Sequence, residues 1–111
     1  MVSLESTDTV ELVVISNDTS LVEGETALLA CVGYGLPYVE ISWLHNGEVV
    51  MNSSLVSTYQ EETVQGGRLF TQSFLQLCSL ELEDAGAYTC VVSNGEMSVN
   101  SSVQLTVAGK V

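Results

Sequence analysis

The sequence predicts an all-β fold, a sandwich or a barrel built from short strands. Short runs of β-branched and apolar residues recur between turn residues along the 111-residue chain. No segment keeps a 3.6-residue apolar period long enough to form a helix. About eight such runs at this spacing are typical of a sandwich or a barrel, and the length fits a single domain.

In the first half of the chain, turn residues separate the expected strands. Strands are expected over residues 10–15 and around 21–22, and a turn follows at 23–25. Residues 26–32 alternate, so one face of this strand should point into a core. Residues 33–37 are expected to form a loop. The two faces of the alternating strand are Ala27, Leu29 and Cys31 on one side and Leu28 and Ala30 on the other.

Two hairpin turns organise the rest of the chain. Asn46-Gly47 tolerates the positive φ that a tight hairpin requires, and it connects expected strands over 38–45 and 49–51. Asn94-Gly95 connects 87–93 with 97–107 in the same way. A further strand is expected over 69–77, whereas the polar segment 52–67 gives no clear strand boundaries.

A set of residues in register resembles a known family. Cys31, Trp43 and Cys90 occur in the order and approximate spacing of a tryptophan packed on a disulfide between two sheets. Cys90 ends the run Asp84-Ala85-Gly86-Ala87-Tyr88-Thr89-Cys90, which resembles a tyrosine corner. The motif Leu75-x-Leu77-x-x-Leu80 precedes it and Asn94 follows it. Together these residues resemble an immunoglobulin domain of the intermediate set, of the type found in neural adhesion molecules and receptor kinase ectodomains.

The resemblance implies an immunoglobulin-like antiparallel β-sandwich whose two sheets are joined by one disulfide, Cys31–Cys90. It implies that Trp43 lies against this disulfide and that the Tyr88 hydroxyl bonds to the backbone at a turn. The domain should cover residues 10–108. Residues 1–9 would then be a flexible extension, and residues 109–111 a short C-terminal tail.

The charge of the chain excludes several classes of partner. Two basic residues, Arg68 and Lys110, stand against 14 Asp and Glu, for a formal charge of −12. No basic patch is available to neutralise phosphates, so we expect neither nucleic-acid binding nor attraction to anionic membranes. The apolar runs are far shorter than the roughly 20 residues of a membrane span, so no direct membrane insertion is expected.

No enzyme, cofactor or metal site is expected. The single histidine, His45, has no second histidine with which to share a metal, and we interpret it as a solvated residue at a strand end. Glu81, Glu83 and Asp84 lack the spacing of a calcium loop. In the family that the chain resembles, the conspicuous cysteines, tryptophan and tyrosine have structural roles.

Three N-glycosylation sequons indicate in which cellular compartment this protein is expected. Their acceptors are Asn17, Asn52 and Asn100. Together with the expected disulfide they favour an extracellular or cell-surface location, as part of a larger protein. The alternative is an intracellular immunoglobulin domain of the muscle type, in which the paired cysteines would stay reduced.

The predicted function is protein recognition without catalysis, as a module of a cell-surface receptor or adhesion protein. A protein ligand steered by charge should be basic. The alternative is a spacer whose only contacts are neighbouring domains of the same chain. Tyrosine and exposed apolar residues are enriched in interfaces. The candidate contact residues are Tyr34, Leu36 and Tyr38 in the expected loop, Leu44 and Val91 on the outer face of one sheet, and Met97.

Cys78 is the odd cysteine and is expected to be unpaired. By alternation it should point outward, on the side of Leu28 and Ala30. One interpretation is a small apolar residue at a strand end. The other is a self-association patch, through which a homodimer would bring two thiols together.

Overall fold

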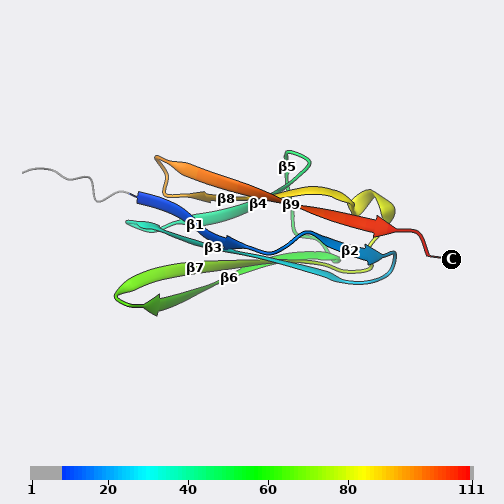
Figure 1. Cartoon of the computed structure of the whole chain (residues 1–111), viewed down its shortest axis with the longest axis horizontal. Helices are drawn as coiled ribbons and strands as arrows, with labels where there is room; N and C mark the ends of the chain where they lie inside the picture. The colour runs from blue at the N-terminus through cyan, green and yellow to red at the C-terminus, as the bar shows by residue number, and fades with distance from the viewer. Residues whose placement is uncertain (1–8, 111) are drawn as a thin grey trace, which may run out of the picture.

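The computed structural model describes residues 9–110, which form two β-sheets packed face to face (Figure 1). One sheet has the strand order β1-β3-β7-β6, and the other has the order β2-β9-β8-β4-β5. The predicted all-β sandwich is confirmed. The elements are β1 (Thr9–Ile15), β2 (Thr19–Val22), β3 (Ala27–Leu36), β4 (Glu40–His45), β5 (Glu48–Val49), β6 (Val56–Gln65), β7 (Arg68–Leu77), the 3₁₀ helix η1 (Leu82–Asp84), β8 (Gly86–Ser93) and β9 (Ser98–Ala108).

The core lies between the sheets and follows from strand alternation. In β3 every second residue is buried, as the sequence predicts, and the same holds along β7 and β8. Leu29 pairs across the sheet with Leu75, and both are fully buried. From the opposite sheet Val92 and Leu105 fill the same layer. Each strand therefore contributes one apolar face to a single core.

The expected loop over residues 33–37 is wrong, because β3 continues to Leu36. Gly33 and Gly35 occupy buried inward positions in this part of the strand. A Cβ atom at Gly33 would lie 2.6 Å from Cγ1 of Val92, and one at Gly35 would collide with Val39. The two glycines are therefore needed for close packing inside a strand, and they do not mark a turn.

The segment between β4 and β7 also differs from expectation. The return strand expected over 49–51 is only the two residues of β5. The polar segment 52–67 contains the ten-residue β6, which pairs with β7 along its whole length. Gly66 and Gly67 connect β6 and β7 with φ values of 60° and 78°, which suit a two-residue hairpin turn.

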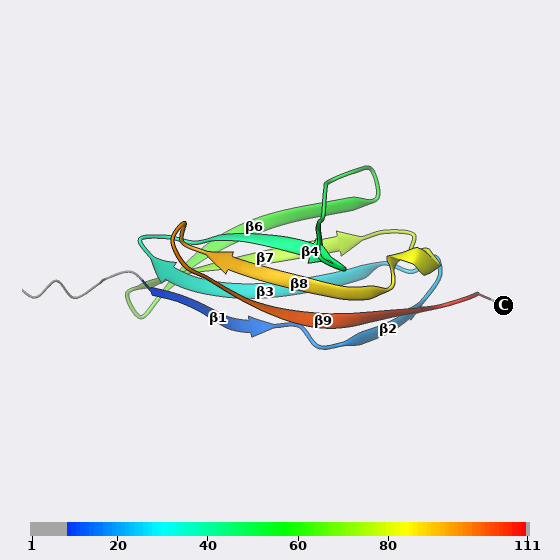
Figure 2. The ribbon, with the colours of Figure 1, turned by 90° about the horizontal axis from the view of Figure 1, so that it is seen from above.

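The four-stranded sheet has one edge strand on each side of the molecule (Figure 2). β1 ends the four-stranded sheet on one side and β6 ends it on the other. The extension expected over residues 1–9 lies outside the described residues except for Thr9, at which β1 already begins. No helix within residues 9–110 is long and apolar enough to cross a membrane.

Candidate functional site

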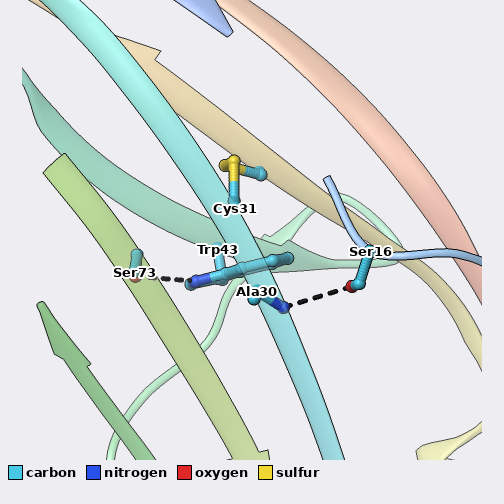
Figure 3. Close-up of a disulfide and its surroundings, with 6 residues drawn as sticks. Ser16, Ala30, Cys31, Trp43 and Ser73 are labelled. Carbon is cyan, nitrogen blue, oxygen red and sulfur yellow. Dashed lines mark hydrogen bonds between the residues drawn. A yellow bond between two sulfur atoms is a disulfide. The ribbon is translucent and has the colours of Figure 1, made fainter. Parts of the chain in front are cut away.

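The disulfide between Cys31 and Cys90 joins the two sheets at the centre of the core, as the resemblance implied. Cys31 comes from β3 and Cys90 from β8, and neither is exposed. Trp43 of β4 lies directly across from Cys90 in the sheet register. Its indole Nε1 donates a 3.0 Å hydrogen bond to Oγ of Ser73 on the opposite sheet (Figure 3). This cluster connects the two layers, and none of its side chains is more than 2% exposed.

The tyrosine corner is confirmed, and His45 packs against it. The Tyr88 hydroxyl donates to the carbonyl oxygen of Asp84. His45 ends β4, as predicted, but the prediction that its ring is solvated is wrong. Its ring stacks on Tyr88 with centroids 4.3 Å apart, and Nε2 donates to the carbonyl oxygen of Ala85 at 2.9 Å. His45 is therefore a half-buried structural residue that covers the corner.

Burial raises the pKa of the Tyr88 phenol well above its ordinary value, and the nearby Asp84 carboxylate adds to the effect. The folded protein thus favours the neutral phenol, so its contribution to stability is complete below the unfolded-state pKa of about 10 and is lost as the pH rises above it. We expect the free energy of unfolding to fall above about pH 10, by up to about 1.4 kcal/mol per pH unit from this group. Urea unfolding of the wild type across this range measures the fall.

Tyr88→Phe is the control for this pH dependence, because it keeps the ring and removes the titrating group. The variant should be less stable at neutral pH, since the Asp84 carbonyl loses its donor. Above about pH 10 its stability should fall less steeply than that of the wild type. Equal slopes for the two proteins would contradict the assignment.

The acidic segment around η1 has a local structural role. A side chain of this segment caps its own turn, because Oδ2 of Asp84 accepts from the backbone N–H of Glu81 at 2.7 Å. Hydrogen bonding and repulsion by the Glu83 carboxylate raise the pKa of the exposed Glu81 side chain. Among residues 9–110, no three His, Cys, Asp or Glu side chains are grouped so as to hold a metal ion.

Three of the predicted contact residues lie together at one end of the sandwich. Leu36, Tyr38 and Met97 are 36%, 55% and 44% exposed. The Asn94 side chain connects their two loops, because Nδ2 donates to the carbonyl oxygen of Leu36 at 3.0 Å and Oδ1 accepts from the N–H of Met97 at 2.8 Å. We call these three residues the apolar tip.

The other predicted contact residues lie elsewhere. Tyr34 belongs to β3 and not to a loop, and its ring packs against Phe70 and under the guanidinium of Arg68 on the outer face of the four-stranded sheet. Leu44 and Val91 are half-buried on the outer face of the five-stranded sheet. The candidate residues therefore fall on three separate surfaces, of which only the apolar tip gathers several of them.

The structure shows where the sequon asparagines and Cys78 lie but does not test their predicted roles. Asn17, Asn52 and Asn100 are all exposed, which an acceptor requires, and their glycosylation stays a prediction. Cys78 follows the end of β7, is half-buried, and is not in a disulfide. Its backbone N–H donates to the carbonyl oxygen of Leu55. Dimerisation through the face that bears Cys78 also stays a prediction.

The sequence analysis missed a groove at the β6 edge of the sandwich. A cavity of about 240 Å³ opens there between the two sheets. Ile41 and Trp43 of β4 line one wall, Val49 and Val50 line the side near β5, and Thr58 and Gln60 of β6 line the other wall. The shortness of β5 leaves this space open. The turn signal Gly66-Gly67 could have indicated the hairpin, but not the gap beside it.

The chain is similar to proteins of two kinds. The family model described as immunoglobulin domain matches residues 11–94. Neogenin from Rattus norvegicus is 31% identical over 107 residues, which cover 93% of this chain and 7% of neogenin. The muscle M-line assembly protein unc-89 from Caenorhabditis elegans is 30% identical over 100 residues, which cover 90% of this chain and 1% of that protein.

A solved structure supports the same assignment. The crystal structure of the N-terminal eight Ig domains of Down Syndrome Cell Adhesion Molecule superposes with a TM-score of 0.83 at 27% identity, over 94% of this chain and 15% of that one. The chain thus spans only a small part of each of these three proteins, one of which is named for cell adhesion and another for muscle. Because the family model covers most of the chain and the fold agrees with it, this chain belongs to the immunoglobulin domain family.

Proposed function

We propose that this domain is a non-catalytic recognition module of a cell-surface receptor or adhesion protein and binds a protein ligand. The observation that carries the proposal is the apolar tip, where Leu36, Tyr38 and Met97 are exposed at one end of a rigid sandwich. Exposed tyrosine and methionine side chains on a fixed scaffold are typical of binding sites. Similarity to a cell adhesion molecule supports the same function.

The extracellular location rests on two further features. The buried Cys31–Cys90 disulfide is characteristic of oxidising compartments. All three sequon asparagines are accessible to a glycosyltransferase. A charge of −12 favours a basic ligand, so its affinity should fall as salt is added.

Alanine substitution at the apolar tip tests the proposal. The domain is titrated against a panel of cell-surface proteins, and the ligand found is measured again with Tyr38→Ala. We expect a loss of about 1–2 kcal/mol in binding free energy, because an aromatic anchor is removed. Leu82→Ala is the matched control, since Leu82 is 51% exposed on η1 at the other end of the sandwich (Figure 1).

The second candidate function is a spacer without a ligand of its own. Similarity to a muscle M-line assembly protein favours it. A spacer binds no protein in the panel, and its apolar tip would contact only a neighbouring domain. Absence of any ligand in the panel would therefore contradict the recognition module and support the spacer.

A further inference from the structure

Strand β6 presents an unpaired edge over half of its length. β6 ends its sheet and pairs only with β7 (Figure 2). Near its start the edge is covered, because the N–H of Thr58 donates to Oδ1 of Asn52 and the carbonyl of Val56 accepts from Ser53. Alternate residues of a strand direct their backbone groups to the same side. The N–H and C=O groups of Gln60, Glu62 and Val64 therefore also point to this edge.

These three residues have no backbone partner on that side in the described part of the chain. β6 is exposed on both faces beyond Thr58, and the side chain of Val64 is 70% exposed. A row of free N–H and C=O groups is satisfied by another extended backbone, which is the basis of strand addition. The free stretch is long enough for a short segment of a partner.

The groove beside this edge indicates which kind of side chain one face of such a segment would carry. The groove opens between Gln60 of β6 and Ile41 and Trp43 of β4, next to the exposed Val49. Every second side chain of an added strand would point into it. The lining of this groove of about 240 Å³ is mixed, because polar side chains such as Thr58 and Gln60 stand beside apolar ones. An apolar side chain of moderate size would contact its apolar part, formed by Ile41, Val49 and Val50.

Charge decides between a second copy of this chain and a different partner. Glu61 and Glu62 lie side by side in the middle of the free stretch and point to opposite faces of the strand. Two copies paired edge to edge there would bring these carboxylates together, in addition to the repulsion between bodies of charge −12. A basic segment would instead find an opposite charge on either face.

We propose that β6 binds an extended, basic segment of a protein partner by strand addition. Gln60, Glu62 and Val64 supply the backbone hydrogen bonds, the groove takes an apolar side chain on their face of the strand, and Glu61 on the opposite face selects positive charge. The inference rests on the proposed function in protein recognition and names the chemistry of the partner.

A synthetic peptide of alternating lysine and valine, seven residues long and capped at both ends, is the probe. It is added to ¹⁵N-labelled domain, and amide shifts and amide exchange are followed by NMR. We expect the amide signals of residues 60–64 to shift and the exchange of Gln60, Glu62 and Val64 to slow. A peptide of alternating glutamate and valine should leave the spectrum unchanged.

Two variants at neighbouring positions separate backbone pairing from charge. Glu62→Pro removes an N–H that points away from the sheet, so the domain should still fold, but the peptide should no longer bind. Glu61→Gln keeps every N–H and removes the carboxylate on the face of the strand opposite the groove, where the lysines of the peptide would lie, so it should weaken binding by about two- to five-fold. Glu96→Gln, the same change in an exposed loop, should leave binding unchanged. Peptide N-methylated at its central residues tests the same hydrogen bonds with the unmodified domain and should not bind.

Three outcomes of the experiments with the peptide would overturn the inference. These are absence of shifts over residues 60–64, unchanged peptide binding by Glu62→Pro, and pairing of two domains through β6 in place of the peptide. A protein ligand that binds Glu62→Pro as tightly as the wild type would also overturn it, while leaving the proposed recognition function intact. Failure to find any protein ligand, with the peptide still bound at β6, would instead contradict the proposed function.

Discussion

Replacing Cys31 and Cys90 together by alanine should lower the free energy of unfolding by about 4 kcal/mol. The two residues are 59 positions apart, and the disulfide that joins them restricts the unfolded chain over that loop. Both side chains are completely buried, so their loss also removes contacts in the core. Urea unfolding followed by circular dichroism measures the change.

Cys78→Ala is the matched control for this double variant. Cys78 is half-buried beyond the end of β7 and takes no part in the disulfide, so its replacement should cost less than about 1 kcal/mol. A double variant as stable as the wild type would show that the disulfide contributes nothing. Domains of this size are stable by only about 5–15 kcal/mol, so a reducing compartment would remove a large share of the stability. This cost connects the disulfide to the proposed extracellular location.

Trp43→Ala should lower the free energy of unfolding by about 3–5 kcal/mol. The Trp43 side chain is 2% exposed. Trp43 lies across from Cys90 in the sheet register, and its indole reaches Ser73 on β7. Its removal leaves a cavity and deprives the hydroxyl of Ser73, which is 1% exposed, of its donor. Because Trp43 is the single tryptophan, unfolding of all variants is followed by circular dichroism and not by fluorescence.

A double-mutant cycle isolates the hydrogen bond from the packing. It combines Trp43→Phe, which keeps an aromatic ring, with Ser73→Ala. We expect a coupling energy of about 1 kcal/mol, the usual net value for such a bond. Leu69→Ala is the control for apolar truncation on β7, and because this side chain is 37% exposed it should cost much less than Trp43→Ala. A loss below about 1 kcal/mol for Trp43→Ala would contradict its place in the core.

The sequence predicts the core of this domain well because burial leaves a periodic signal. Leu105 belongs to the second half of β9, in which buried apolar residues alternate with exposed polar ones. Leu29 and Leu75 are also buried at alternate positions of their strands, although apolar residues stand on both faces of β3. Alternation is visible whenever one face of a strand packs on a core and the other meets solvent. The cysteine pair and Tyr88 add positions that are specific to the fold, so the connection of the two sheets is also predictable.

The extent of β3 and β6 was not predictable from the same signal. Gly33 and Gly35 favour a loop by composition, and only the approach of Val92 and Val39 across the core explains why glycine stands in a strand there. β6 is exposed on both faces over most of its length, so its side chains carry no alternation. It is a strand because its backbone pairs with β7, and that pairing leaves no trace in side-chain polarity.

The sequence by itself determined the acidic charge and the absence of a basic patch, because composition suffices for these. Its resemblance to a known family also implied the fold family and the disulfide. Only the tertiary structure decided which side chains share a surface. It placed His45 on Tyr88, separated Tyr34 from the apolar tip, and opened a groove between β4 and β6. Each of these depends on contacts between segments far apart in the chain, and a single sequence does not encode such distances in any local pattern.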